Sequence, residues 1–246
     1  MDAVGLEAFD HCVSDACEFL EIGRRDFFSL AQRWPEFART ILDWPEDPGA
    51  WYSTWVGVRG RSNVCLNIID QFSRPHIVAL LKKLPGLVSQ AKPHPLAFAD
   101  VGCGSAAVSF EIARHFSTAY LIDVPNLPQE FVTWRCRRNQ LGHIATGTVD
   151  DIASPVDVMM CIDVLEHIAA STDFFVSMTR FLKPGGLLFM QAPWYSVNPN
   201  DEHLPEAEED WNKPGGGRDL LGAGYTRLER WPDGGVYQKQ QRGAVA

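Results

Sequence analysis

The stretch FADVGCGSA, residues 98–106, decides the expected fold of this chain. An apolar run ends at Asp100, glycines stand at positions 102 and 104, and an amphipathic segment follows over residues 107–116. This order predicts a strand, a tight glycine turn and a helix. Glycine lets the backbone approach a ligand closely because it has no Cβ, and the start of a helix offers N–H groups without intrahelical partners. The stretch therefore predicts a site for a cofactor with a ribose, a base and a charged tail.

Strand-like and helix-like segments alternate beyond residue 95, which predicts a parallel sheet with crossover helices. The last part differs, because the turn PDGG at 232–235 separates two strand-like runs, 225–230 and 236–240. This pattern predicts an antiparallel hairpin. The other predicted strands lie near residues 96–101, 118–123, 143–148, 156–161 and 186–191, and the predicted helices between them lie at 105–116, 127–140 and 171–182.

The glycine pattern alone fits two kinds of cofactor. The pattern GxGxxA at 102–107 satisfies the loose dinucleotide fingerprint, and Asp123 lies about 20 residues further on, where NAD binding needs an acid. Asp100, however, stands where its carboxylate could meet a cationic amino-acid tail. Two further motifs follow in order: VLEHI at 164–168 after one strand-like run, and FLKPGG at 181–186 before another.

Together these motifs resemble those of class I S-adenosylmethionine-dependent methyltransferases over roughly residues 96–240. The resemblance implies an α/β, Rossmann-like methyltransferase fold with a mostly parallel seven-stranded sheet. The predicted C-terminal antiparallel hairpin agrees with that fold, whereas a dinucleotide-binding dehydrogenase would keep its strands parallel there. The resemblance also implies S-adenosylmethionine as the cofactor.

The resemblance assigns cofactor-binding roles to residues at the strand ends. Asp123 would accept hydrogen bonds from the ribose hydroxyls, and its charge would strengthen them; the alternative is a carboxylate that only caps the turn. Asp151 would accept from the adenine amino group while the Ile152 N–H meets the ring, in preference to Asp150. Asp163 ends the fourth strand, where methyl donor and acceptor should meet. The full predicted set is Asp100, Gly102, Gly104, Asp123, Asp151, Ile152 and Asp163.

Two histidines are the candidates for a catalytic base. His167 follows the fourth strand, and an imidazole suits the removal of a proton from an acceptor hydroxyl; the alternative is that it holds the cofactor or the strand. His203 lies beyond the fifth strand, where it could wall the acceptor site with Trp194 and Tyr195. Methyl transfer needs positioning more than acid–base chemistry, since sulfonium is already a strong leaving group. No metal site is predicted, because the six cysteines have no paired metal spacing.

The chain is predicted to have two parts. Residues 1–92 would form a helical cap or dimerisation region, and residues 93–246 the methyltransferase domain. Apolar residues recur at near-helical spacing between Val4 and Phe19. Further helices are predicted at Pro35–Leu42 and Ser62–Phe72, and from Pro75 to Pro85.

Composition limits the partners and the compartment. A net charge of −9 argues against a nucleic-acid substrate, and Arg135, Arg137 and Arg138 are predicted to lie on a solvated helix face. No apolar stretch approaches the length of a membrane span, and no secretory signal is predicted. Cysteines without pairing suit a reducing cytosol. We therefore expect a cytoplasmic protein with a small-molecule partner, without nucleic-acid or membrane partners, and with a homodimer as an expected assembly.

The leading hypothesis is S-adenosylmethionine-dependent methyl transfer to a small molecule, with an oxygen of a secondary metabolite as the nucleophile. The element IDVP at 122–125 resembles one in hydroxyaryl O-methyltransferases of plants and bacterial secondary metabolism. Their base motif is missing, and VLEH stands at 164–167 instead, so only the fold and the cofactor carry over. The alternatives are a non-catalytic scaffold with the same fold and an NAD-dependent oxidoreductase.

Overall fold

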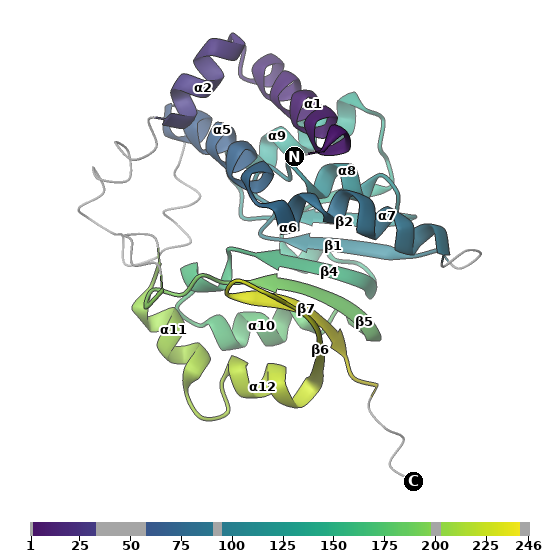
Figure 1. Ribbon diagram of the computed structural model, residues 1–246, viewed down its shortest axis with the longest axis vertical. Coiled ribbons are helices and arrows are strands. Elements are labelled where there is room, and N and C mark those ends of the chain that lie inside the picture. Colours follow the sequence, from purple (N-terminus) through teal and green to yellow (C-terminus); the bar gives the residue numbers. More distant parts are fainter. Residues whose placement is uncertain (1, 33–57, 91–94, 198–202, 242–246) are drawn as a thin grey trace. The chain divides into compact units, whose positions relative to one another are not determined.

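The computed structural model describes residues 2–32, 58–90, 95–197 and 203–241 (Figure 1). Within these residues lies a seven-stranded sheet with the strand order β3-β2-β1-β4-β5-β7-β6. The pairs β2–β3, β1–β4 and β4–β5 are parallel, whereas β7 is antiparallel to both β5 and β6. The predicted Rossmann-like sheet and its C-terminal hairpin are thus confirmed. The strands are β1 Ala97–Val101, β2 Thr118–Ile122, β3 Ile144–Gly147, β4 Val156–Ile162, β5 Leu182–Gln191, β6 Tyr225–Trp231 and β7 Gly234–Lys239.

Some helices precede the first strand in the chain, and others connect the strands. The predicted helix at Pro35–Leu42 lies outside the described residues, and the helix predicted from Pro75 is divided in two at Ala79. The helices are α1 Ala3–Phe19, α2 Arg24–Gln32, α5 Val58–Ser73, α6 Pro75–Val78, α7 Leu80–Gln90, α8 Ser109–Ala113, α9 Leu127–Arg138, α10 Ser171–Thr179, α11 Pro205–Asn212 and α12 Gly217–Gly224, with short 3-10 helices η1 Val149–Asp151 and η2 Leu165–His167. No helix among the described residues is both long enough and apolar enough to cross a membrane.

The chain divides into two compact units. The first unit comprises residues 1–96 and 103–151, and the second comprises residues 97–102 and 152–246. Among the described residues, the first therefore contains α1, α2 and α5 to α9 with β2 and β3, and the second contains β1, β4 and the elements that follow β4 in the chain. The division at residues 92 and 93 expected from the sequence stays a prediction.

In the first unit, the N-terminal helices pack on one another and on α9. Helices α1, α2 and α5 are in mutual contact, and α1 and α5 also contact α9. The amphipathic face of α1 explains this, because Ala8, Cys12 and Ala16 recur every four residues and are buried. At the end of α1, Phe19 packs against Phe131 of α9, with ring centroids 5.4 Å apart.

Arg135 corrects one expectation from the sequence. Its side chain is fully buried in the first unit, not solvated, whereas Arg137 and Arg138 on the same helix are exposed. The Arg135 Nε donates to an Asp15 carboxylate oxygen at 2.9 Å, and its Nη2 donates to a Glu111 carboxylate oxygen at 3.4 Å. A buried guanidinium needs such partners, and they come from α1 and α8, far away in the sequence. The predicted solvated face is therefore wrong for Arg135.

In the second unit, β5 is longer than predicted. The strand begins at Leu182, which pairs with Val156, so α10 ends at Thr179 and the predicted helix to residue 182 is too long. Gly185 lies within β5 at φ +80°, where the register between β4 and β5 shifts. This irregularity hides the strand start in the sequence pattern, because proline and glycine rarely occupy strand interiors.

Helices α10, α11 and α12 of the second unit contact one another. Phe175 of α10 packs edge-on against Trp211 of α11, with ring centroids 5.2 Å apart. Asp210 ties these helices further, since its carboxylate accepts a hydrogen bond from the Thr172 N–H at 2.8 Å. Helix α11, which carries Asp210, therefore packs its apolar face, with Ala207 and Trp211 buried.

Candidate functional site

The carboxylate of Asp123 is fastened to the glycine turn in the first unit. Asp123 directly follows β2, and its Oδ2 accepts a hydrogen bond from the Gly104 N–H at 2.6 Å. Its Oδ1 accepts from the Val124 N–H at 2.7 Å and from the Asn126 side-chain amide at 3.3 Å. A carboxylate has about four lone-pair positions, of which three are used here. One position remains for a ribose hydroxyl, and exchange of the long 3.3 Å bond from Asn126 provides a second.

Burial governs the protonation of Asp123. It raises the pKa of this carboxyl to about 6, although the hydrogen bonds from Gly104, Val124 and Asn126 act in the opposite direction. Desolvation disfavours the charged form. The carboxylate is therefore half ionised at about pH 6 and almost fully ionised only above about pH 7.

Helix α5 supports the same turn, which the sequence did not indicate. The Gln71 side chain accepts a hydrogen bond from the Val108 N–H at 3.1 Å and donates one to the Cys103 carbonyl at 3.4 Å. A Cβ placed on Gly104, which has φ +53°, would overlap the Asn67 carboxamide. Asn67 and Gln71 are four residues apart on one helix face, which is the single hint that the sequence carries.

The turn also shortens the helix that follows it. The sequence predicted a helix over residues 105–116, but α8 spans only Ser109–Ala113. Ala106 has φ +46°, a left-handed conformation incompatible with a continuous α-helix. Residues 103–108 therefore form a loop whose N–H groups and carbonyls bond to Asp123 and Gln71.

The loop after β3 holds the predicted adenine ligands. Asp151 is exposed, and its carboxylate accepts hydrogen bonds from the Thr148 N–H at 2.7 Å and the Thr148 hydroxyl at 3.0 Å. These hydrogen bonds lower the pKa of Asp151, so the side chain is a stable anion at neutral pH. Ile152 follows with its side chain buried. The carboxylate of Asp151 in this arrangement caps the turn.

Gly102 lies in the second unit, at the end of β1. A Cβ on this residue would overlap the Val164 side chain, and Gly102 has φ +76°. Glycine is therefore required here for close packing and for the left-handed backbone. The sequence suggested that glycine stands here to let a cofactor approach the backbone. In the structure, the reason is packing against Val164.

The second unit gathers buried negative charge at the ends of β1 and β4. Asp100 in β1 is buried, and Asp163 follows β4 at φ +56°. Together with burial, the charges of Glu166, Asp100 and Asp163 raise the pKa of the Cys161 thiol well above its ordinary value. This environment favours a cation such as a sulfonium or an ammonium group.

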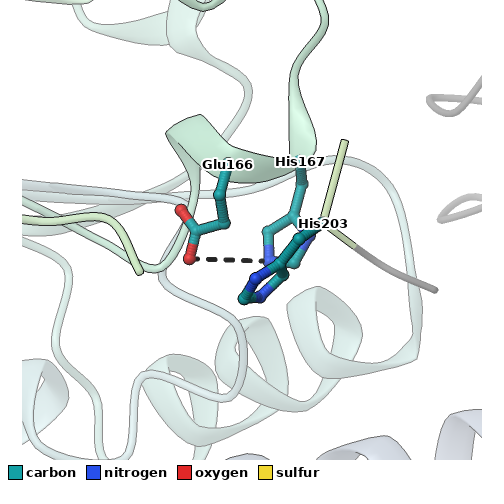
Figure 2. Close-up of side chains that lie close together, drawn as sticks. All are labelled: Glu166, His167 and His203. Atoms are coloured by element: carbon teal, nitrogen blue, oxygen red, sulfur yellow. Dashed lines mark ion pairs between the residues drawn. The ribbon is translucent and has the colours of Figure 1, made fainter. Parts of the chain in front are cut away.

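The two predicted catalytic histidines lie against each other in the second unit, beside Glu166 (Figure 2). Their ring centroids are 5.0 Å apart, at an interplanar angle of 72°. The His167 Nε2 lies 3.9 Å from a carboxylate oxygen of Glu166, whose side chain is fully buried. The Leu204 N–H donates to the Glu166 carbonyl at 2.9 Å, which holds the His203 segment beside η2. In the sequence, Glu166 has no distinguishing signal beyond its place in the VLEHI motif.

The three residues predicted to line the acceptor site, Trp194, Tyr195 and His203, lie in different environments. Trp194 stacks on Trp211 at a centroid distance of 5.4 Å, so it packs against α11. Tyr195 is 38% exposed and His203 is buried. Of the three residues predicted to line the acceptor site, Trp194 therefore has a clear packing role.

The central part of the chain is similar to a known protein family. Residues 99–190, which include the glycine turn, Asp123, Asp163 and His167, match the family model "Methyltransferase domain". This match assigns a class I S-adenosylmethionine-dependent methyltransferase domain to that part of the chain. S-adenosylmethionine is accordingly its cofactor, as predicted.

Curated methyltransferases resemble the central part of the chain. A ubiquinone biosynthesis O-methyltransferase of Actinobacillus pleuropneumoniae is 31% identical over 102 residues, which are 38% of this chain and 44% of that protein. Its counterpart in Xanthomonas oryzae pv. oryzae is 30% identical over 98 residues, 38% of this chain and 41% of that protein. The chain thus spans less than half the length of the curated relatives that it matches. This similarity assigns the domain, not the relatives' whole reaction.

Solved methyltransferases share the fold. An O-methyltransferase family protein from Burkholderia thailandensis has a TM-score of 0.51 at 14% identity, covering 89% of this chain and 71% of that one. Magnesium protoporphyrin IX methyltransferase from Synechocystis PCC 6803, solved with bound S-adenosylmethionine, also has a TM-score of 0.51, at 12% identity. It covers 81% of this chain and all of that one. Identities this low support the fold alone.

The raised pKa of Asp123 predicts that binding of S-adenosylhomocysteine depends on pH. Ribose hydroxyls donate to the ionised carboxylate, so affinity should fall as pH drops through about 6 and the carboxyl gains its proton. At about pH 5 the affinity should be about tenfold lower than above pH 7. Calorimetric titration across this range measures the effect. The control is Asp123→Asn, whose affinity should be lower and independent of pH in this window; equal pH profiles for both proteins would contradict the assignment.

Proposed function

We propose that this protein transfers the methyl group of S-adenosylmethionine to a hydroxyl oxygen of a small-molecule acceptor, a secondary metabolite. The observation that carries the proposal is the methyltransferase-domain match over residues 99–190, within which Asp123 is already fastened to Gly104. A loop that is held in shape before the cofactor arrives loses less conformational entropy on binding. The names of the curated relatives support oxygen as the nucleophile.

Seven residues are proposed to contact the cofactor. Asp123 accepts from the ribose hydroxyls, and Asp151 and Ile152 meet the adenine. Asp100 is buried in β1, and Asp163 directly follows β4. Their negative charges suit the ammonium and sulfonium groups of S-adenosylmethionine. Gly102 and Gly104 shape the glycine turn that follows β1. The proposed set is Asp100, Gly102, Gly104, Asp123, Asp151, Ile152 and Asp163.

The proposed reaction is a single displacement in which positioning contributes most of the catalysis. The acceptor oxygen loses its proton to His167 or His203, and its electron pair forms the new O–CH₃ bond. The electron pair of the broken C–S bond returns to sulfur, which leaves the neutral thioether S-adenosylhomocysteine. The low exposure of this histidine pair, 15% for the His167 side chain and 7% for His203, supports its placement, because proton transfer is best controlled where bulk water is excluded.

We also propose a cytoplasmic protein without nucleic-acid or membrane partners. All six cysteines are free thiols, and burial raises the pKa of the thiols of Cys12, Cys65 and Cys136 to between about 11 and about 12. Such thiols are poorly reactive and suit a reducing compartment. The negative net charge supports a small-molecule acceptor over a nucleic acid. A homodimer formed through the N-terminal helices is the proposed assembly.

S-adenosylhomocysteine should raise the melting temperature of the purified protein. A ligand at about 100 times its dissociation constant stabilises the folded state by about 2.7 kcal/mol, which corresponds to roughly 5–10 °C for a chain of this size. Thermal scans with S-adenosylhomocysteine and, separately, with NADH measure this. A shift with NADH alone would favour an oxidoreductase, and no shift with either ligand would favour a non-catalytic scaffold. Either result would overturn the proposal.

A further inference from the structure

The cluster of Glu166, His167 and His203 points to a function that neither the sequence nor the family similarity assigns. We propose that these three side chains bind one divalent transition-metal cation. The inference rests on the proposed function for its role, which is to hold the acceptor oxygen. It adds a metal site where the sequence predicted none.

The geometry is that of a three-ligand site. One ligand atom from each of Glu166, His167 and His203 lies within 4.8 Å of the other two. Bonds of 2.0–2.2 Å from a zinc ion to nitrogen and oxygen would place these atoms about 3–3.5 Å apart. Shifts of roughly 1 Å in the side chains close the difference. Figure 2 shows the Glu166 carboxylate, the His167 ring and the His203 ring converging on the same space.

The backbone presents these side chains in a fixed arrangement. Glu166 and His167 are adjacent on η2, whereas His203 arrives from a separate segment that leads into α11. The hydrogen bond from the Leu204 N–H to the Glu166 carbonyl, at 2.9 Å, joins the two segments beside the site. Helix α11 also contacts η2 directly. A site supported in this way loses little entropy when it captures an ion.

Burial and charge favour a cation at this position. Glu166 is fully buried, His203 is 7% exposed, and the His167 side chain is 15% exposed. A carboxylate in such surroundings is stabilised by direct contact with a positive charge. Asp100 and Asp163 add negative charge within the same unit, because Asp100 lies in β1 and Asp163 directly follows β4. The field within this unit therefore attracts cations.

The donor set selects the class of ion. Imidazole nitrogen suits zinc, iron and other first-row transition metals, whereas magnesium and calcium prefer oxygen ligands throughout. Two imidazoles and one carboxylate supply three protein ligands, which leaves a coordination position for a substrate oxygen. Bound there, an acceptor hydroxyl would release its proton more readily because the ion lowers its pKa. With the ion bound, both imidazoles are ligands, so this route replaces the transfer of the proton to His167 or His203, and the proton leaves to solvent.

The experiment titrates protein freed of metal by a chelator, without a histidine tag, with Zn²⁺ by calorimetry and with Co²⁺ by visible absorption. The wild type should bind one equivalent of each ion. His167→Ala, His203→Ala and Glu166→Gln should each lower the affinity by at least ~10–100-fold, since loss of even an outer-shell partner has this effect. The matched control is His115→Ala, an exposed histidine of the first unit, which should bind the ions as the wild type does.

Three outcomes would overturn the inference: no binding of either ion at millimolar concentration, equal binding by wild type and the three variants, or a thiolate-to-cobalt absorption band that places the ion on a cysteine. Thermal shift with S-adenosylhomocysteine is measured on the same preparations. It shows that each variant is folded, and it separates the two hypotheses. A protein that binds S-adenosylhomocysteine but no metal retains the proposed function and loses the metal site. A protein that binds the metal but not S-adenosylhomocysteine retains the metal site and loses the proposed function.

Discussion

Asp123→Ala is expected to weaken S-adenosylhomocysteine binding by roughly 30- to 1000-fold. The variant loses the hydrogen bonds to the ribose, which at ~1.5–3 kcal/mol each and with partial compensation by water amount to ~2–4 kcal/mol. It also loses the acceptor for the Gly104 N–H, which at 2.6 Å holds the glycine turn in place. Isothermal titration calorimetry at about pH 7.5, where the wild-type carboxylate is ionised, measures the change.

A surface aspartate provides the control for this variant. Asp173 is exposed in the first turn of α10, and Asp173→Ala should leave the affinity unchanged. Thermal scans without ligand show whether Asp123→Ala is folded. Wild-type affinity in a folded Asp123→Ala protein would show that the carboxylate only caps the turn, which is the alternative that the sequence leaves open.

Arg135→Ala is expected to lower the free energy of unfolding by about 3–5 kcal/mol, the cost typical of breaking a buried ion pair. The guanidinium pairs with Asp15 and Glu111, and its carbon lies 3.7 Å from the centre of the Phe110 ring. Removing it leaves two largely buried carboxylates, 19% and 17% exposed, facing a cavity. Urea unfolding followed by fluorescence measures the change, because the midpoint shifts with stability.

The same helix offers a matched control. Arg137 is exposed, so Arg137→Ala should change the free energy of unfolding by no more than about 0.5 kcal/mol. A destabilisation in Arg135→Ala as small as that of the control would mean that the buried pairs contribute no net stability. Since Arg135 packs among α1, α8 and α9, the variant should still bind S-adenosylhomocysteine at temperatures where it is folded.

The sequence by itself determined the elements whose information is local. Apolar runs with strand periodicity gave β1, β2, β3 and β4 to within two residues at either end, and the PDGG turn gave the antiparallel hairpin. The glycine turn was also readable, because Gly102 and Gly104 have positive φ, a conformation that favours glycine. Strand, turn and helix propensities act over a few residues, so they survive in the sequence pattern.

Two element boundaries were predicted wrongly because the backbone is irregular there. The start of β5 was missed because Pro184 and Gly185 break the strand pattern while the backbone still pairs with β4. Helix α8 was predicted too long because nothing local announces the left-handed Ala106. In both places tertiary hydrogen bonding overrides the propensity of single residues.

Only the tertiary structure decided which distant residues meet. Arg135 is buried because α1 and α8 supply its carboxylates, and Gln71 reaches the glycine turn because α5 packs there. His203 lies against His167 because a backbone hydrogen bond fixes its segment beside η2. Such contacts depend on the path of the chain between the partners. The sequence therefore named both histidines, but only the fold brought them together with Glu166 as a candidate metal site.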